Sequence, residues 1–152
     1  MLENTTSTET ANAWSGAIQP GFKSAVHAVV LNPFVKFQGL ELFGNIERAK
    51  GKAATEPAYR QWNQYVGEAT YRFMGNEQAF VSGRYNTARG QLAGITNKVG
   101  ANRYQVGGGF FLTPTVVLKG EYVNQKYNDF PVTDIRSGGK FKGYMIEGVV
   151  AF

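Results

Sequence analysis

The stretch RYQVGGGFFLTPTVVLKGEYVNQKYN (103–128) decides the fold. Apolar and polar residues alternate on both sides of TPT (113–115), which is the pattern of two β-strands joined by a tight turn. The two runs, 103–112 and 115–127, are longer than the usual strand of about 5–6 residues. The stretch therefore predicts a long β-hairpin.

The same alternation continues along the chain, and no segment has a helical apolar stripe with caps at its ends. We therefore expect an all-β protein. The composition, with 19 Gly and 14% aromatic residues in 152, disfavours disorder and a coiled coil. Seven strands are expected, at 24–35, 39–50, 62–73, 78–89, 103–112, 115–127 and 141–152.

The connections between these strands alternate in length. The short ones are KFQG (36–39), MGNE (74–77) and TPT (113–115), and the long ones span about 51–61, 90–102 and 128–140. Short turns at one end and long loops at the other are typical of an antiparallel up-and-down transmembrane β-barrel, with periplasmic turns and extracellular loops. A strand of about twelve residues tilted by about 40° spans about 30 Å, the thickness of a bilayer core.

The two faces of the expected strands differ in charge. One face carries no charge and includes Leu42, Ala69, Val81, Val106 and Leu118, and in the first strand we assign to it Val26, Ala28, Val30 and Phe34. The opposite face carries the charged residues Glu41, Glu47, Glu68, Arg72, Arg84, Lys119, Glu121 and Glu147. Alternation alone does not say which face is inside, since a soluble lipocalin-like barrel would bury the apolar face.

The distribution of aromatic residues favours the membrane barrel. Near the short turns lie Phe34, Phe73, Phe110 and Phe152, and toward the long loops lie Tyr65, Tyr85, Tyr104, Tyr122 and Tyr144. Aromatic girdles at both ends of an apolar band mark the two membrane interfaces. We therefore expect the apolar face to contact lipid and the charged face to line the lumen.

Basic residues continue the apolar face beyond the tyrosines. They are Arg48, Arg89, Lys126 and Lys142. Long basic side chains at this height can extend toward anionic headgroups. The expected partners are therefore outer-membrane lipid and lipopolysaccharide, in a bacterial outer membrane.

The strand count leaves two alternatives open. Strands 24–35 and 141–152 run in the same direction, whereas a complete bacterial barrel has an even number of strands. Residues 1–23 are expected to form a polar extracellular loop or a poorly formed first strand, at best 12–19. The simpler inference is that the chain is the C-terminal part of a larger barrel with further strands or subunits. The alternative is a self-contained eight-stranded barrel.

The residue inventory argues against an enzyme. There is no cysteine, and the one histidine, His27, is assigned to the polar face, where we expect a hydrogen-bonded wall residue. Basic residues do not interleave with exposed aromatic residues as on a nucleic-acid platform. We expect no catalytic residue, no metal, no cofactor and no nucleic-acid partner.

Several segments resemble a known family. They are NPFVKFQGLELFG (32–44), YRF (71–73), SGRYNTARG (82–90), RYQVGGGFFLT (103–113), GEYVNQKYNDFP (120–131) and GGKFKGYMIEGVVAF (138–152). These resemble the C-terminal half of porin-like outer-membrane β-barrels of Bacteroidetes-type Gram-negative bacteria. The resemblance implies a larger barrel and passive diffusion of small solutes or ions. A closed eight-stranded barrel would instead have a structural or surface-binding role through its extracellular loops.

The last residue carries a separate expectation. A terminal aromatic residue after a strand of alternating apolar residues resembles the signal through which the barrel-assembly machinery recognises its substrates. We therefore expect the C-terminal strand ending in Phe152 to bind that machinery.

Overall fold

The computed structural model describes residues 16–152, which form one antiparallel sheet. Helical structure in this part of the chain is limited to a 3-10 turn, η1 (Gly75–Glu77). The strands are β1 (Ala25–Leu31), β2 (Phe34–Phe37), β3 (Leu40–Lys52), β4 (Arg60–Phe73), β5 (Ala79–Gly90), β6 (Val99–Thr113), β7 (Val116–Asn128) and β8 (Lys140–Val150). The all-β prediction is confirmed. Among residues 16–152, no helix has the length and apolar character needed to cross a membrane.

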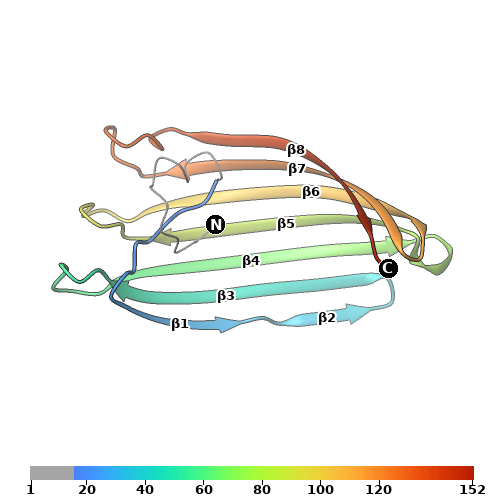
Figure 1. Ribbon diagram of the computed structural model, residues 1–152, viewed down its shortest axis with the longest axis horizontal. Helices are drawn as coiled ribbons and strands as arrows, with labels where there is room; N and C mark the ends of the chain where they lie inside the picture. The colour runs from blue at the N-terminus through green and yellow to red at the C-terminus, as the bar shows by residue number, and fades with distance from the viewer. Residues whose placement is uncertain (1–15) are drawn as a thin grey trace.

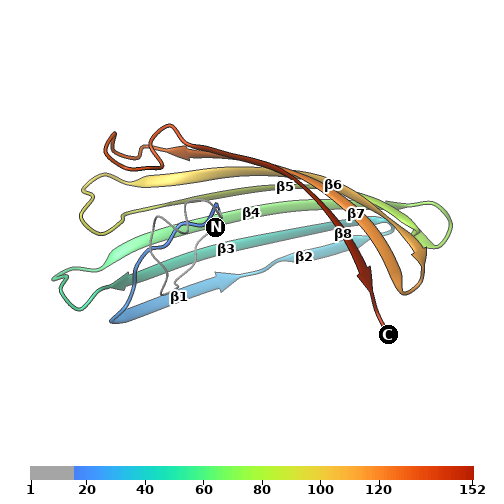
Figure 2. The same cartoon turned by 45° about the horizontal axis from the view of Figure 1, so that its top comes forward.

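The strands follow one another in space as they do in sequence. The order is β1-β3-β4-β5-β6-β7-β8, with β2 also paired to β3, and every neighbouring pair is antiparallel. Figures 1 and 2 show that the sheet is a curved, open wall with the three long loops at one end. Within the described residues, β1 and β8 are not paired with each other. The up-and-down order was predicted correctly, and the sheet is not closed.

β1 and β2 occupy a single strand position. Leu31 lies opposite Ile46 and Phe34 lies opposite Phe43, so the register against β3 continues across Asn32 and Pro33. The interruption follows from Pro33, which has no N–H to donate to the ladder. Its carbonyl oxygen still accepts a hydrogen bond from the Gly44 N–H at 2.8 Å.

The register corrects the predicted faces of this first strand. Phe34 lies opposite Phe43, on the face of Glu41 and Glu68, and Val35 lies opposite Leu42. Placing Phe34 in the aromatic row of the apolar face was therefore wrong, as was placing His27 on the polar face. Val26, Ala28 and Val30 were also assigned to the wrong face. The cause is the segment AVHAVVLNPFVKF (25–37), which is apolar at both parities, so that only pairing with β3 distinguishes its faces.

The faces of the later strands agree with the prediction. Leu42 lies opposite Ala69, Ala69 opposite Gly83, and Gly83 opposite Val106. Residues paired across an antiparallel ladder share a face, so one apolar face runs from β3 to β8. We call it the apolar face, and we call the face that carries Glu68 the charged face. β8 ends at Val150, two residues earlier than predicted.

The buried core lies on the charged face, near the long loops. Its members are Ile18, Phe22, Ala49, Trp62, Ala88, Leu92, Val99, Ala101, Tyr127 and Phe130. Ile18 and Phe22 belong to the segment before β1, which crosses the wall near the long loops in Figure 2. Of the predicted N-terminal region, 1–15 lies outside the described residues, and 16–22 is a packed segment with one bridge residue, Ile18.

Candidate functional site

The apolar face is exposed along its whole width. Leu42, Val81, Val106, Leu118 and Ile146, from five different strands, each expose between 45% and 82% of their surface. A folded chain rarely exposes an apolar patch of this extent unless something covers it. An apolar face of this extent is the main feature of the sheet that the fold itself does not account for.

The tyrosines predicted as one girdle lie in a row across this face. Tyr85 and Tyr104 are directly opposite each other with ring centroids 4.8 Å apart, and Tyr122 and Tyr144 repeat the arrangement at 5.0 Å. Tyr65 lies on β4 opposite Thr87. Each paired ring covers its neighbour on the sheet surface.

The tyrosine row does not run along the hydrogen-bond direction. Tyr65 is opposite Thr87, two residues from Tyr85, and Tyr104 is opposite Asn124, two residues from Tyr122. Both offsets lead toward the short turns. From β4 to β8 the row moves by about 13 Å along the strands over about 19 Å across them. The row is therefore inclined by about 35° to the hydrogen-bond direction. If the row is taken as horizontal, the strands are tilted by the same angle, about 35°, from the vertical.

The phenylalanines predicted as the other girdle are less uniform. Phe73 and Phe110 lie on the apolar face near the short turns, each opposite Ala79, and Phe73 stacks on Tyr71 with 6.2 Å between ring centroids. Phe152 is fully exposed and lies beyond the end of β8. Phe34 is on the charged face, as described above.

A band of basic residues follows the tyrosines toward the long loops. The predicted members Arg48, Arg89, Lys126 and Lys142 all lie on the apolar face. Arg48 donates to the Gln61 side chain at 2.9 Å, and Arg89 pairs with Asp129 at 3.0 Å. Sequence reasoning missed further members, although continued alternation in β3 and β8 indicates most of them: His27, Lys50, Lys52 and Lys140.

The eight residues predicted to line a lumen share the charged face. Ion pairs join Glu41 to Arg72 at 3.0 Å, Glu68 to Arg84 at 3.5 Å and Lys119 to Glu147 at 3.0 Å. Glu121 accepts a hydrogen bond from the Gln105 side chain at 2.7 Å, and Glu47 lies opposite Gln64. The wall is therefore lined by neighbouring charges of both signs.

Lys36 is a basic residue of this face that sequence reasoning missed. Its ammonium lies 3.2 Å from Glu41 and 3.3 Å from Glu77. It was overlooked because the sequence analysis assigned it to the turn KFQG (36–39), whereas β2 continues to Phe37. With Lys36 and Arg103 included, the five acids of the wall lie among five bases, Lys36, Arg72, Arg84, Arg103 and Lys119. Arg60, a sixth base on this face of β4, is buried and pairs with Glu56 of the adjoining loop.

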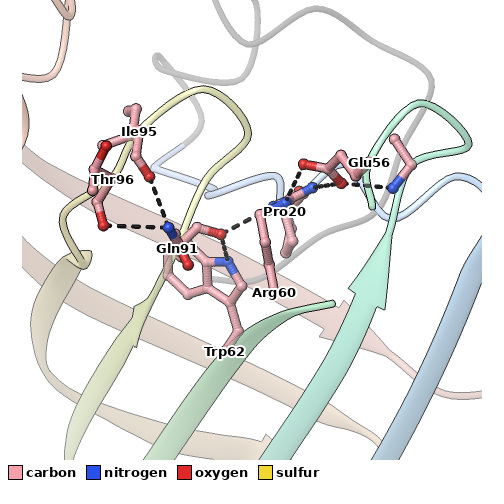
Figure 3. A network of polar contacts seen from close by, with 8 residues as sticks. Pro20, Glu56, Arg60, Trp62, Gln91, Ile95 and Thr96 are labelled. Carbon is pink, nitrogen blue, oxygen red and sulfur yellow. Dashed lines mark hydrogen bonds and ion pairs between the residues drawn. The ribbon is translucent and has the colours of Figure 1, made fainter. Parts of the chain in front are cut away.

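A polar network holds the segment before β1 against the long-loop end of the wall (Figure 3). The Arg60 guanidinium donates to both carboxylate oxygens of Glu56, at 2.7 and 3.0 Å, to the Pro20 carbonyl at 2.7 Å and to the Gln91 carbonyl at 3.0 Å. The Trp62 indole donates to the same Gln91 carbonyl at 2.9 Å. One buried arginine thus ties two loops and the N-terminal segment together.

A second contact fixes the start of this segment. The Gly16 carbonyl accepts hydrogen bonds from Arg103 at 3.1 Å and from the Gln125 side chain at 2.8 Å. Gly16 has φ of 73°, and a Cβ there would collide with the Arg103 guanidinium. Residues 16–22 therefore reduce the open width of the charged face at its long-loop end.

The loops at this end contain two carboxyl groups with shifted titration. The hydrogen bonds from Arg60 lower the pKa of Glu56, and the hydrogen bond from Arg136 lowers the pKa of Asp134. Arg136 also lies over the Phe130 ring, with its Cζ 4.5 Å from the centroid. Both carboxylates are therefore held in ion pairs at the long-loop end, Glu56 with Arg60 and Asp134 with Arg136.

Residues 16–152 contain no group of three or more His, Cys, Asp or Glu side chains that could hold a metal ion. His27 lies opposite Lys50, with its ring centroid 6.1 Å from that of Tyr59. Comparison with protein-family models, with curated proteins and with solved structures finds no match to this chain.

Proposed function

We propose that this chain is part of the wall of an outer-membrane β-barrel that allows small solutes or ions to diffuse passively. The observation that carries the proposal is the tyrosine row on an exposed apolar face. A membrane interface is flat, so in a barrel of tilted strands its aromatic residues must shift in register from strand to strand. The shift here corresponds to a tilt of about 35°, at the edge of the 35–45° range of transmembrane barrels.

The order of residues along β7 agrees with a membrane boundary. On β7 the apolar face carries Leu118, Gly120, Tyr122, Asn124 and Lys126 in succession, from the short turn to the long loop. The residues thus change from apolar to aromatic, then to polar and then to basic, as expected for a strand that passes from the hydrocarbon core into the headgroup region. A face with this gradient suits lipid better than a protein core.

The charged face suits a hydrated lumen. Its acids and bases are only partly buried and are paired across neighbouring strands. Charged rings in a pore set its ion selectivity. Because the charges here are balanced, this wall would confer at most weak selectivity.

The open edges support the larger barrel. The sheet that residues 16–152 form has seven strand positions, so β1 and β8 both run from the long loops to the short turns. These two edges cannot form an antiparallel pair, nor can the corresponding edges of two copies with the same membrane orientation. Antiparallel closure therefore requires an odd number of additional strands between β8 and β1.

The packed segment 16–22 favours the second candidate, a narrow barrel with a structural or surface-binding role. Ile18 and Phe22 are buried against Trp62 and Val99, on the face that would line the lumen. In a barrel of about eight strands the interior is filled by side chains, so a segment packed inside it would block the passage of solutes.

Conductance distinguishes the two candidates. The protein purified from its native membrane should give open-channel steps in planar bilayers. Arg84→Glu and Lys119→Glu each leave neighbouring acids without their partner base, so both should shift the reversal potential toward cation preference. Lys126→Glu, on the other face, is the charge-matched control and should leave selectivity unchanged. A correctly assembled barrel that does not conduct would overturn the diffusion role.

A further inference from the structure

Three lysines lie together on the apolar face at the long-loop end of β7 and β8. Lys126 is directly opposite Lys140, and Lys142 follows two residues later on the same face, opposite Asn124. All three side chains are exposed. Like charges placed directly opposite each other destabilise a ladder. A local rule of sheet pairing is broken here.

The protein does not compensate these charges. Among the described residues, ion pairs form at Lys36, Arg60, Arg72, Arg84, Arg89, Lys119 and Arg136, and none forms at the three lysines. Lys119, on the same strand as Lys126, does have a partner: its ammonium lies 3.0 Å from Glu147. The cluster therefore has a local positive potential available to an external anion.

The lysines surround a shallow hollow. It has a volume of about 230 Å³, and its other lining residues are Asn102, Tyr104 and Asn124. Ammonium, amide and phenol groups are all hydrogen-bond donors, and the ammonium groups are strong partners of phosphate oxygens. The lining thus fits a phosphate group better than a carboxylate, because it offers several donors around one concavity.

The height of the hollow selects the source of the phosphate. Tyr104 lines the hollow and also belongs to the tyrosine row. On β8, Lys142 is two residues closer to the long loop than Tyr144. A site at this height meets lipid headgroups if the tyrosines mark the membrane interface. We propose that Lys126, Lys140 and Lys142 bind a phosphate group of a phosphorylated lipid on the long-loop side of the membrane. This assignment rests on the membrane placement proposed above.

The test compares two double variants with the same loss of charge. Lys140→Gln/Lys142→Gln removes two of the cluster's ammonium groups, and Lys23→Gln/Lys98→Gln removes two exposed ones from a connecting segment and a loop. Native mass spectrometry of the detergent-solubilised full-length protein measures retention of bisphosphorylated lipid A and of its dephosphorylated form. We expect the cluster variant to bind lipid A at least tenfold more weakly and the control variant to bind it normally.

Three results would overturn the site: equal losses in both variants, equal binding of the dephosphorylated lipid, or displacement of lipid A by equimolar inorganic pyrophosphate. The last would identify a site for free phosphate. The result is independent of conductance. If the parent protein binds lipid A but gives no channel steps, only the proposed diffusion role is wrong. If it gives channel steps but the cluster variant binds lipid A as well as the parent does, only the headgroup site is wrong.

Discussion

Pro33 lies across the ladder from Gly44, and the two residues are closely packed. A Cβ at position 44 would come within 2.9 Å of the proline Cγ, while the Gly44 N–H donates to the Pro33 carbonyl at 2.8 Å. The proline interrupts the edge strand and the glycine makes room for its ring. The pair therefore fixes the position of β1 and β2 against β3.

Gly44→Ala should therefore destabilise the sheet edge. The added methyl must displace the Pro33 ring or lengthen the hydrogen bond, and overpacking of this kind costs about 1–3 kcal/mol. Gly67, directly opposite Gly44 on β4, is the matched control, since its Cβ would have no atom within 4 Å. Urea unfolding of the protein in detergent measures both variants. Equal losses would show that the Pro33 contact is unimportant.

This edge also shows where prediction from sequence succeeded and failed. Between the basic residues at the long-loop end and the short turns, the charges of each strand from β3 to β8 fall at one parity only, so alternation identified both faces correctly there. In 25–37 both parities are apolar, and the faces depend on the register with β3, which is not a local property. The same error placed Phe34 in the aromatic row, whereas Lys36 was missed because the predicted strand ended at residue 35 and β2 ends at Phe37.

Contacts between segments that are distant in sequence could not be predicted from local residue patterns either. Arg60 and Trp62 alternate with polar residues like any other members of β4, and nothing in that spacing indicates that they bind Pro20 and Gln91. The apolar residues on the charged parity of the strand ends, such as Val99 and Ala101, were a signal for the core. Their cover, residues 16–22, was missed because it ends the stretch 1–23, which is polar over most of its length and was expected to be a loop, although GAIQPGF itself contains Ile18 and Phe22.

Two neighbouring residues of β6 test the assignment of the faces. Val106→Arg places a charge in the middle of the apolar face, and in lipid this costs about 2–4 kcal/mol. Gln105→Arg places the same side chain on the charged face, opposite Arg84 and beside Glu121, where the carboxylate offsets the like charge and we expect a smaller loss. Folding in lipid vesicles, followed by heat-dependent gel mobility, measures both. If Val106→Arg folds as well as Gln105→Arg, the apolar face does not contact lipid.

The Glu56–Arg60 pair makes the long-loop end sensitive to acid. The pKa of Glu56 in the folded protein is lowered from 4.5 by the hydrogen bonds from Arg60. The ion pair therefore contributes fully to stability above about pH 4.5, and this contribution is lost as the pH falls through the lower folded pKa. Glu56→Gln should remove this contribution, about 1 kcal/mol after allowance for its partial exposure. The variant should lose less stability than the parent protein between pH 5 and pH 3.

Asp129→Asn is the control for that experiment, because the Asp129–Arg89 pair is more than half exposed and should contribute little. Amide hydrogen exchange in 53–59 and 91–98 reports the local effect, since both loops are joined through Arg60. Faster exchange in Glu56→Gln at pH 7, with Asp129→Asn unchanged, is the expected result. No difference between the variants would contradict the role of Arg60 as the common anchor.

Phe152 should matter for assembly and hardly at all for stability. Its side chain is fully exposed beyond β8, so deleting it removes little buried area, whereas Phe110→Ala removes a ring that is 41% exposed and so more than half covered, at the same end of the sheet. If the C-terminal strand is recognised by the barrel-assembly machinery, deletion of Phe152 should reduce the protein in the outer membrane severalfold, and Phe152→Tyr should restore it. Phe110→Ala should be assembled but less stable. Quantitative blotting of membrane fractions measures the first effect and urea unfolding the second. Normal membrane levels after deletion of Phe152 would mean that the terminal aromatic residue is not the signal.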